Sequence, residues 1–438
     1  MKAMKLLVLI SLLLAIGCYS NQENSTGVIG EKSQQGGALV DGSLSKNILI
    51  PKTFAEPLRI NLHDECGEVP VTPLPPVDIS QPTVVTLSEN HRFLINGQLF
   101  FPIGLYGVPG SPDVMDDISS AGFNAAQTYT GCCDGSSLDD QKAFLQSAQD
   151  AGVVGVVHPF SDPNVIYSTP PADLQALLAQ REAYGSLLFW YTFDEPGLWG
   201  VPTQLTSDYN EFLHTYAGNH PNALVECPAQ DLTMYMPSTD FMMIDPYPVP
   251  MFPIREVWDM TLLALEAANG EKGVFGVPQA FDWDEDIGII PPNHVFRPTV
   301  PEMRNMTWQF LALGANGLLY FCYGRITAHP EEWAGLQGIV SEVNSVSAVI
   351  AEPMLGFVPV QPNVPYVVAT YRKHEGINYM IAISLWIHPV DITFDLSGFT
   401  DSPWCAVALF EDGRQVPLNG QTLTDHFEPN EVHVYQIR

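Results

Sequence analysis

Basic residues are scarce in this sequence. Eighteen lysines and arginines stand against 49 aspartates and glutamates in 438 residues, so the formal net charge is −31 at pH 7. A surface this acidic repels phosphate backbones, and nucleic acid is therefore excluded as an expected partner. A disordered or fibrous chain is not indicated either, because hydrophobic residues make up 46% of the sequence. The chain is long enough to bury a large core and to exceed one ordinary domain.

The apolar run at the start of the chain is too short to span a bilayer. It covers Leu6 to Ile16 and follows the basic residues Lys2 and Lys5. Residues 1–18 resemble a bacterial lipoprotein signal, which implies that Cys18 is lipidated and becomes the mature N-terminus. An ordinary secretory signal is the alternative. We therefore expect an exported protein of the bacterial periplasm or outer surface, with the lipid anchor as its only membrane contact.

Patterns that bind metals are also missing. No spacing of Cys and His resembles a zinc site, and an acidic run lacks the regular spacing of a calcium loop; this run comprises Asp282, Asp284, Glu285 and Asp286. We predict no metal and no cofactor, and a solvent-exposed rim for the acidic run. The cysteines other than Cys18 permit disulfides in an oxidising compartment, but the sequence does not choose their pairing.

Secondary-structure signals divide the rest of the chain into three segments. Residues 19–85 are predicted to form a flexible tether with a proline-stiffened lead-in. Residues 86–351 open with a hairpin around Asn96-Gly97, a pair typical of a two-residue type I′ turn, and continue as strands alternating with helices. Residues 352–438 contain short strands without helices between them, which predicts an all-β sandwich.

The middle segment has the size and pattern of a (β/α)8 barrel. We expect its eight strands at 101–107, 123–130, 152–159, 186–193, 222–227, 240–246, 273–279 and 316–323. A doubly wound open sheet is the competing topology. It is disfavoured because no glycine fingerprint for a dinucleotide follows an early strand.

The strongest functional signal is Asp194-Glu195-Pro196, which ends the apolar and aromatic run from Leu187 to Phe193. The active sites of (β/α)8 barrels lie at the carboxyl ends of their strands. An apolar strand that stops at two acids therefore predicts catalytic carboxyl groups. A plain helix N-terminus, where acids suit the helix dipole, is the alternative.

Several motifs resemble those of clan A glycoside hydrolases, which are sugar-cleaving (β/α)8 barrels. The motifs are Arg92–Gly97 leading into Phe101–Gly104, Ala121–Asn124, Asp194-Glu195-Pro196, and Pro301–Arg304 with Ala312–Gly317. The resemblance implies that Glu195 is the acid/base residue, because an Asn-Glu-Pro motif after strand four carries that residue in the clan. The C-terminal β-sandwich is also common in these enzymes.

Two departures from the clan pattern bear on the mechanism. Gln279 stands at the strand-seven position of the nucleophilic glutamate, and an amide cannot attack the anomeric carbon to form a glycosyl-enzyme. Asp194 replaces the asparagine that donates a hydrogen bond to the sugar, and an ionised aspartate only accepts hydrogen bonds.

Both departures fit a substrate that supplies its own nucleophile. Adjacent Asp-Glu pairs after strand four resemble substrate-assisted β-N-acetylhexosaminidase families, including bacterial β-N-acetylgalactosaminidases. This resemblance implies that Asp194 orients the acetamido group and stabilises the oxazolinium intermediate, while Glu195 is the general acid/base. Such a mechanism predicts that no third carboxyl group lies about 5 Å from Glu195 beneath the anomeric carbon.

Five residues after later strands are predicted to contact the sugar, and each could serve packing instead. Tyr247 could hydrogen-bond the acetamido carbonyl and Asp245 a hydroxyl group. Trp283 and Tyr323 offer ring faces on which a pyranose can stack, and Gln279 offers a polar contact.

The remaining polar residues of the barrel are expected to be structural: Glu226 as a buried salt-bridged group, and His158, Glu302 and Arg304 in packing contacts. Two other functions stay open. One is a glycosidase acting on neutral β-linked sugars, with its second carboxylate from Glu226, Asp245 or Asp282. The other is a non-catalytic surface lipoprotein that binds glycans.

Overall fold

The computed structural model describes residues 66–129, 137–227, 232–283, 297–363 and 366–438. The predicted signal segment with Cys18 and the acidic residues 284–286 lie outside the described residues. No helix among the described residues is long and apolar enough to cross a membrane.

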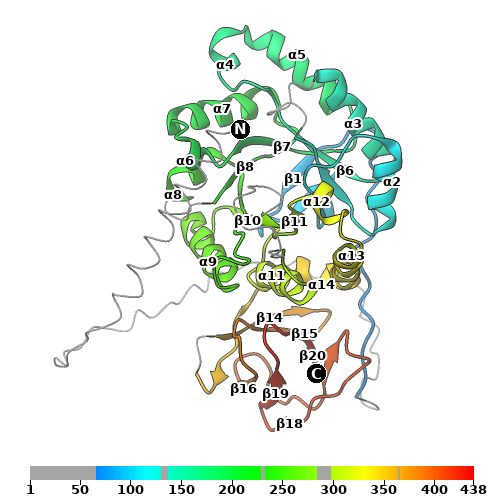
Figure 1. The fold of residues 1–438 in the computed structure, drawn as a ribbon, viewed down its shortest axis with the longest axis vertical. Coiled ribbons are helices and arrows are strands. Elements are labelled where there is room, and N and C mark those ends of the chain that lie inside the picture. Colours follow the sequence, from blue (N-terminus) through cyan, green and yellow to red (C-terminus); the bar gives the residue numbers. More distant parts are fainter. Residues whose placement is uncertain (1–65, 130–136, 228–231, 284–296, 364–365) are drawn as a thin grey trace, which may run out of the picture. The chain divides into compact units, whose positions relative to one another are not determined.

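Eight parallel strands form a closed barrel (Figure 1). In chain order they are β4 (Ile103–Leu105), β5 (Ala125–Gln127), β6 (Val154–Val157), β7 (Leu187–Asp194), β8 (Asn222–Glu226), β9 (Phe241–Ile244), β10 (Gly273–Gly276) and β11 (Leu318–Tyr320). Each lies within one predicted strand or extends one residue beyond it. The predicted barrel is therefore confirmed, and the doubly wound sheet is wrong.

Helices follow the strands and surround the barrel (Figure 1). The longer ones are α2 (Pro112–Ser120), α3 (Leu138–Asp150), α5 (Pro171–Glu182), α7 (Thr203–Tyr216), α9 (Glu256–Ala268), α11 (Val300–Ala312) and α13 (Pro330–Ser345). The shorter ones are α4 (Val165–Ser168), α6 (Pro196–Trp199), α8 (Leu232–Tyr235), the 3-10 helix η2 (Met236–Ser238), α12 (Tyr323–Ile326) and α14 (Ser347–Ala351).

Local sequence signals explain where several helices begin and end. Helix α11 starts with a capping box, in which Thr299 Oγ1 accepts from the amide of Glu302 and the Glu302 carboxylate accepts from the amide of Thr299. Helices α2 and α3 end before Gly122 and Gly152, whose φ values of 90° and 72° suit glycine. The structural role predicted for Glu302 is confirmed.

A three-stranded sheet lies at the amino-terminal end of the barrel. It comprises β1 (Val85–Leu87), β2 (Phe93–Ile95) and β3 (Gln98–Phe100), and the positive φ values of Asn96 and Gly97 fit the predicted turn. The fully buried ring of Phe93 contacts the rings of three barrel residues, with centroids 5.2 to 6.3 Å apart: Phe189, Phe241 and Phe275. The hairpin therefore closes the end of the barrel opposite the acid pair.

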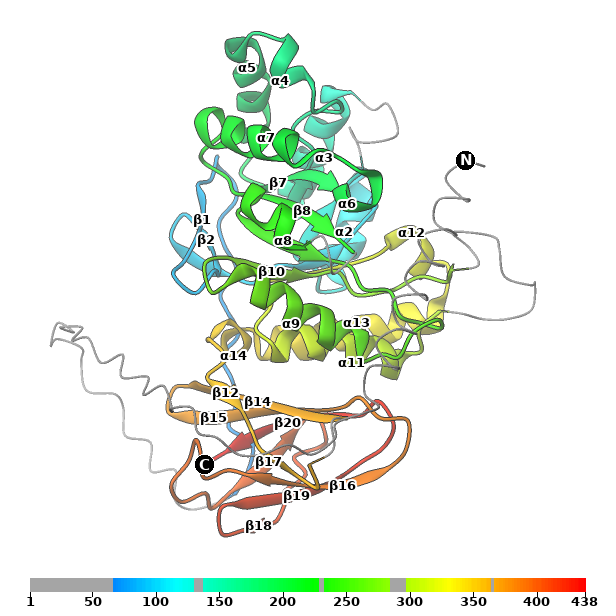
Figure 2. The ribbon, with the colours of Figure 1, turned by 90° about the vertical axis from the view of Figure 1, so that its left-hand side faces the viewer.

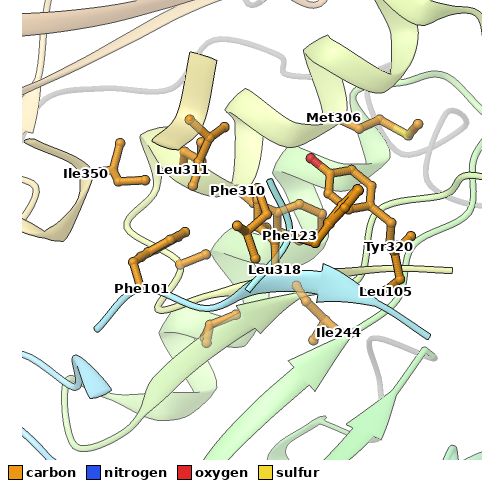
Figure 3. Packing of buried hydrophobic residues seen from close by; sticks show 14 of the residues in the cluster. Phe101, Leu105, Phe123, Ile244, Met306, Phe310, Leu311, Leu318, Tyr320 and Ile350 are labelled. Atoms are coloured by element: carbon orange, nitrogen blue, oxygen red, sulfur yellow. The ribbon is translucent and has the colours of Figure 1, made fainter. Parts of the chain in front are cut away.

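The layer between the barrel and its outer helices is closely packed (Figure 3). The ring of Phe310 on α11 lies so close to Gly276 of β10 that an added Cβ would stand 2.6 Å from it. The hydroxyl of Tyr320 on β11 hydrogen-bonds Thr307 at 2.7 Å, and the ring of Phe123 meets the Tyr320 ring edge to face. Such packing holds the strand ends in fixed positions.

The C-terminal segment is a two-layer β-sandwich (Figure 2). One sheet contains β12 (Gly356–Phe357), β14 (Val367–His374), β15 (Ile377–Ser384), β20 (Val432–Ile437) and β17 (Ala406–Leu409). The other contains β13 (Val360–Gln361), β16 (Val390–Asp395), β19 (Thr422–Phe427) and β18 (Leu418–Asn419). Buried apolar side chains of both sheets, among them Phe394 and Met380, fill the space between them. The predicted sandwich is confirmed.

Polar side chains that are buried or partly buried connect the barrel to the sandwich. Arg372 of β14 donates to the carbonyl groups of Leu311 and Ala312 at the end of α11. Arg304 of α11 donates to the Glu342 carboxylate and to the carbonyl of Val432. The structural role predicted for Arg304 is therefore confirmed.

The start of the described chain is attached to the sandwich. Cys66 forms a disulfide with Cys405, across 339 residues of sequence. The amide of Val69 then donates to Gln436 of β20 at 2.8 Å, and the amide of Leu74 donates to Ser347 of α14. The proline-rich lead-in therefore follows the sandwich before it reaches the barrel.

Candidate active site

Asp194 and Glu195 stand at the carboxyl end of β7, where the chain turns sharply. The amide of Glu195 donates to the carbonyl of Val225 on β8 at 3.0 Å. Glu195 then takes the left-handed conformation, with φ 44° and ψ 57°, and precedes the short helix α6. A glutamate in this region costs roughly 1–3 kcal/mol, so the turn is held in place by its surroundings.

Glu226 at the end of β8 holds this turn. Its carboxylate is fully buried and accepts hydrogen bonds from the amides of Gly197 at 2.7 Å and Cys227 at 3.1 Å. The predicted burial of Glu226 is confirmed. The salt bridge predicted for Glu226 stays a prediction. Glu226 thus supports the segment that presents Glu195.

A third carboxyl group lies beside Glu195. Carboxylate oxygens of Glu195 and Asp245 and the sulfur of Cys227 all lie within 4.8 Å of one another. The two carboxyl groups of an ordinary retaining glycosidase are about 5–5.5 Å apart. A third carboxyl group is therefore present at the distance from Glu195 at which the assisted mechanism predicted none.

Burial and mutual repulsion separate the pKa values of these acids. Burial raises the pKa of Asp194 to about 6, against the opposite effect of the Tyr191 hydroxyl. Burial and the charges of Asp194 and Glu226 raise the pKa of Glu195 to about 8. For Asp245, burial and the neighbouring carboxylates raise the pKa well above its ordinary value. Near pH 7 Asp194 is thus mainly ionised and Glu195 mainly protonated, and Asp245 loses its proton less readily than an exposed aspartate does.

Three tyrosines for which the sequence predicted no role face the acids. Tyr106 follows β4, Tyr129 follows β5, and Tyr191 lies within β7; the ring centroid of Tyr106 is 5.8 Å from each of the other two. Burial raises the pKa of all three well above 10, and the charge of Asp194 adds to this shift. Their hydroxyl groups are therefore neutral donors. Two of them stand near the carboxyl ends of predicted strands, which is the signal that could have found them.

Tyr247 lies beside the carboxyl group of Asp245, and Trp283 lies beside Tyr247; the sugar contacts expected of both stay predictions. Tyr247 hydrogen-bonds Asp245, and its ring lies 5.0 Å from Phe281, 5.7 Å from Phe321 and 6.1 Å from Trp283. Trp283 Nε1 donates to the carbonyl of Tyr247 at 3.4 Å. These aromatic rings form one wall next to the acids.

Gln279 does not have the predicted role of a sugar contact. The residue is fully buried, and its amide is bonded to the backbone of the segments after β9 and β10. Oε1 accepts from the amide of Val249 at 2.9 Å, and Nε2 donates to the carbonyl groups of Val249 and Phe281 at 2.8 and 3.2 Å. The side chain is thus occupied within the protein.

The sugar contact predicted for Tyr323 is also wrong. Its ring contacts Trp333 of α13, and both residues line a hollow with Asp117 and Gln337 on the outer side of the barrel. Alternation along a strand would have put residues 321 and 323 on one face, but helix α12 begins at Tyr323 and turns it away. Phe321 is the residue that lies beside Tyr247.

Two further predictions concern buried polar residues. His158 is buried, with its ring edge to face with Tyr191, as expected of a barrel histidine. Asp282 is only 5% exposed, so the prediction of a solvent-exposed rim is wrong for this residue. Residues 284–286 lie outside the described part of the chain.

Among the described residues, one group of side chains could hold a metal ion. It comprises the carboxyl groups of Glu195 and Asp245 and the thiol of Cys227. This donor set would suit a transition metal with an affinity for sulfur. The same carboxyl groups also suit proton transfer, and the predicted absence of a metal stays a prediction.

The fold is similar to those of solved sugar-acting enzymes. For a glycoside hydrolase family 5 protein from Bacteroides vulgatus the TM-score is 0.60 and the identity 14%, over 84% of this chain and 95% of that chain. For a family 27 β-L-arabinopyranosidase from Geobacillus stearothermophilus the TM-score is 0.55 and the identity 11%, over 77% of this chain and 96% of that chain. For an α-galactosidase/melibiase candidate from Bacteroides fragilis the TM-score is 0.53 and the identity 10%, over 79% of this chain and 82% of that chain.

No protein-family model and no curated protein sequence matches this chain. At identities of 10–14% the structural likeness concerns the fold. The comparisons and the strand order agree on that fold, which is a (β/α)8 barrel followed by a C-terminal β domain.

Proposed function

We propose that this protein is a retaining glycoside hydrolase in which Glu195 is the general acid/base. The observation that carries the proposal is the half-buried pair Asp194 and Glu195 at the carboxyl end of the fourth barrel strand, with pKa values of about 6 and 8. A protonated Glu195 can give its proton to the leaving oxygen and then take one from water. The structural likeness to glycoside hydrolases supports this reaction class.

We further propose that the sugar at the cleaved bond carries a 2-acetamido group. In this mechanism the acetamido oxygen attacks the anomeric carbon while Glu195 protonates the departing oxygen. The C–O bond breaks, and the resulting oxazolinium ion is positive at its nitrogen. Ionised Asp194 stabilises this charge by accepting a hydrogen bond from the N–H group. The occupied amide of Gln279 supports the assignment, because the seventh strand offers no nucleophile at this position.

A panel of aryl glycosides tests this proposal. We expect release of nitrophenol from 4-nitrophenyl N-acetyl-β-hexosaminides, little release from the matching sugars with a 2-hydroxyl group, and inhibition by a thiazoline analogue of the intermediate. Hydrolysis of the 2-hydroxyl sugars alone would contradict the acetamido requirement and leave the reaction class intact. No hydrolysis of any glycoside would contradict the reaction class.

A second candidate is an ordinary double-displacement glycosidase with Asp245 as its nucleophile. The observation that favours it is the separation of at most 4.8 Å between carboxylate oxygens of Asp245 and Glu195. Asp245 Oδ1 is buried and accepts no hydrogen bond from the described residues. Against this role stands the raised pKa of Asp245, since burial and the neighbouring carboxylates disfavour the ionised form that acts as a nucleophile.

The two candidates differ in their covalent intermediates. A 2-deoxy-2-fluoro aryl glycoside should label Asp245 if this residue attacks the anomeric carbon, and peptide mass spectrometry would locate the label. The assisted mechanism predicts no label, because the fluoro sugar lacks the attacking acetamido group.

We also propose that the protein is exported and held at the membrane by a lipid on Cys18. The disulfide between Cys66 and Cys405 supports export, because such bonds persist in oxidising compartments. Metabolic labelling with a fatty acid should mark the wild-type chain and leave Cys18→Ser unlabelled. Equal labelling of both chains would contradict the anchor.

A further inference from the structure

Gln279 is a buried amide that the proposed reaction does not use directly. It stands after β10, at the carboxyl end of the seventh barrel strand. Its oxygen accepts from the amide of Val249, and its nitrogen donates to the carbonyl groups of Val249 and Phe281. Because Gln279 is 0% exposed, water does not compete for these three bonds.

Both partners belong to segments that shape the candidate site. Val249 lies two residues after Tyr247, which hydrogen-bonds Asp245. Phe281 packs against the Tyr247 ring at 5.0 Å, and Trp283 donates to the Tyr247 carbonyl. The Gln279 side chain therefore connects the segment after β9 with the segment after β10.

We propose that Gln279 is a positioning residue that holds the segment carrying Asp245 and Tyr247 beside Glu195. The Gln279 amide has two N–H donors for the two backbone carbonyl groups, and its oxygen accepts from the one backbone amide. A carboxyl group at this position supplies one donor at most, and only while protonated. Gln279→Glu therefore removes part of the connection instead of supplying a nucleophile. The catalytic consequence rests on the proposed function, whereas the connection between the two segments does not.

Hydrogen exchange tests the connection without any substrate. In Gln279→Met the amide of Val249 loses its acceptor, so we expect exchange in residues 245–252 to become about tenfold faster. Gln141→Met is the matched control, because Gln141 is also buried and donates to a backbone carbonyl, that of His158, on another side of the barrel. Exchange in residues 245–252 should be unchanged in this control. Wild-type exchange in a folded Gln279→Met protein would overturn the inference.

Kinetics test the positioning role. A displaced acid or base lowers the rate of the chemical step, and we expect kcat of Gln279→Met to fall on the order of 10²-fold with a smaller change in KM. For Gln279→Glu we expect a kcat below wild type that falls further as the pH rises, with no new hydrolysis of 2-hydroxyl glycosides. A wild-type kcat in both variants, or a gain on 2-hydroxyl glycosides, would overturn the role. If wild type cleaves no glycoside, the proposed function fails and the exchange result alone decides the inference.

Discussion

Asp194 and Glu195 are similar side chains in adjacent positions, yet their surroundings give them different protonation states. Glu195 meets the charges of both Asp194 and Glu226, whereas the Tyr191 hydroxyl stabilises the ionised form of Asp194. The residue with the higher pKa keeps the proton that the leaving group needs. The residue with the lower pKa supplies the negative charge. Two acids with separated pKa values can therefore share one reaction.

Substitution of the acid should affect poor leaving groups most. Glu195→Gln cannot protonate the departing oxygen, so kcat/KM for natural oligosaccharides should fall by about 10²–10⁴-fold. The loss should be smaller for 2,4-dinitrophenyl glycosides, whose leaving group needs no proton. Initial rates on the two substrate types measure this difference. An equal loss on both would show that Glu195 acts in another way.

The pKa values predict a bell-shaped dependence of kcat/KM on pH. Activity should fall below about pH 6, where Asp194 becomes protonated, and above about pH 8, where Glu195 loses its proton. Because the acids interact, the two apparent pKa values of this profile belong to the coupled acids together and not to single residues. In Asp194→Asn the acidic limb should move or vanish. An activity that stays constant from pH 7 to pH 10 would contradict the assignment of Glu195.

At the scale of elements, the strands were predictable and the partners of their end residues were not. Apolar runs and the Asn96-Gly97 turn are local signals, and they located the barrel strands and the hairpin. Gln279 forms bonds with Val249, which lies 30 residues earlier in the sequence. No local pattern reveals such a contact. Tyr323 was misjudged because a helix begins where the strand period was expected to continue.

The hairpin at the amino-terminal end of the barrel provides a prediction about stability. Phe93 is fully buried against three phenylalanine rings of the barrel, so Phe93→Ala should lower the free energy of unfolding by about 3–5 kcal/mol. Leu94→Ala is the matched control, because Leu94 lies on the other face of the same strand and is only partly buried. Denaturant unfolding of both variants measures the difference. Equal losses would mean that the hairpin does not close the barrel as described.

At the scale of the whole molecule, long-range bonds join parts that the sequence analysis treated separately. The pairing of Cys66 with Cys405 spans 339 residues and could not be chosen from the sequence. The same holds for Arg372, a sandwich residue that donates to carbonyl groups at the end of a barrel helix. The patterns of strands and helices predicted the barrel and the sandwich, but only the folded chain shows how they are connected.

The disulfide should stabilise the folded chain as a unit. Cys66→Ser should lower the free energy of unfolding by about 2–4 kcal/mol, because the bond restricts the unfolded chain. Cys405→Ser should have a similar effect, and the double variant should lose no more than either single variant, since all three lack one bond. Thermal unfolding under oxidising conditions measures these effects. Additive losses would indicate that the two cysteines do not pair.

The central claim is that Asp194 stabilises an intermediate formed by the substrate's own acetamido group. Its most direct test is the rate of nitrophenol release from a 4-nitrophenyl N-acetyl-β-hexosaminide by wild type and by Asp194→Asn. We expect kcat of the variant to fall on the order of 10²-fold, with little change in ground-state binding. Full activity of Asp194→Asn on this substrate would contradict the claim.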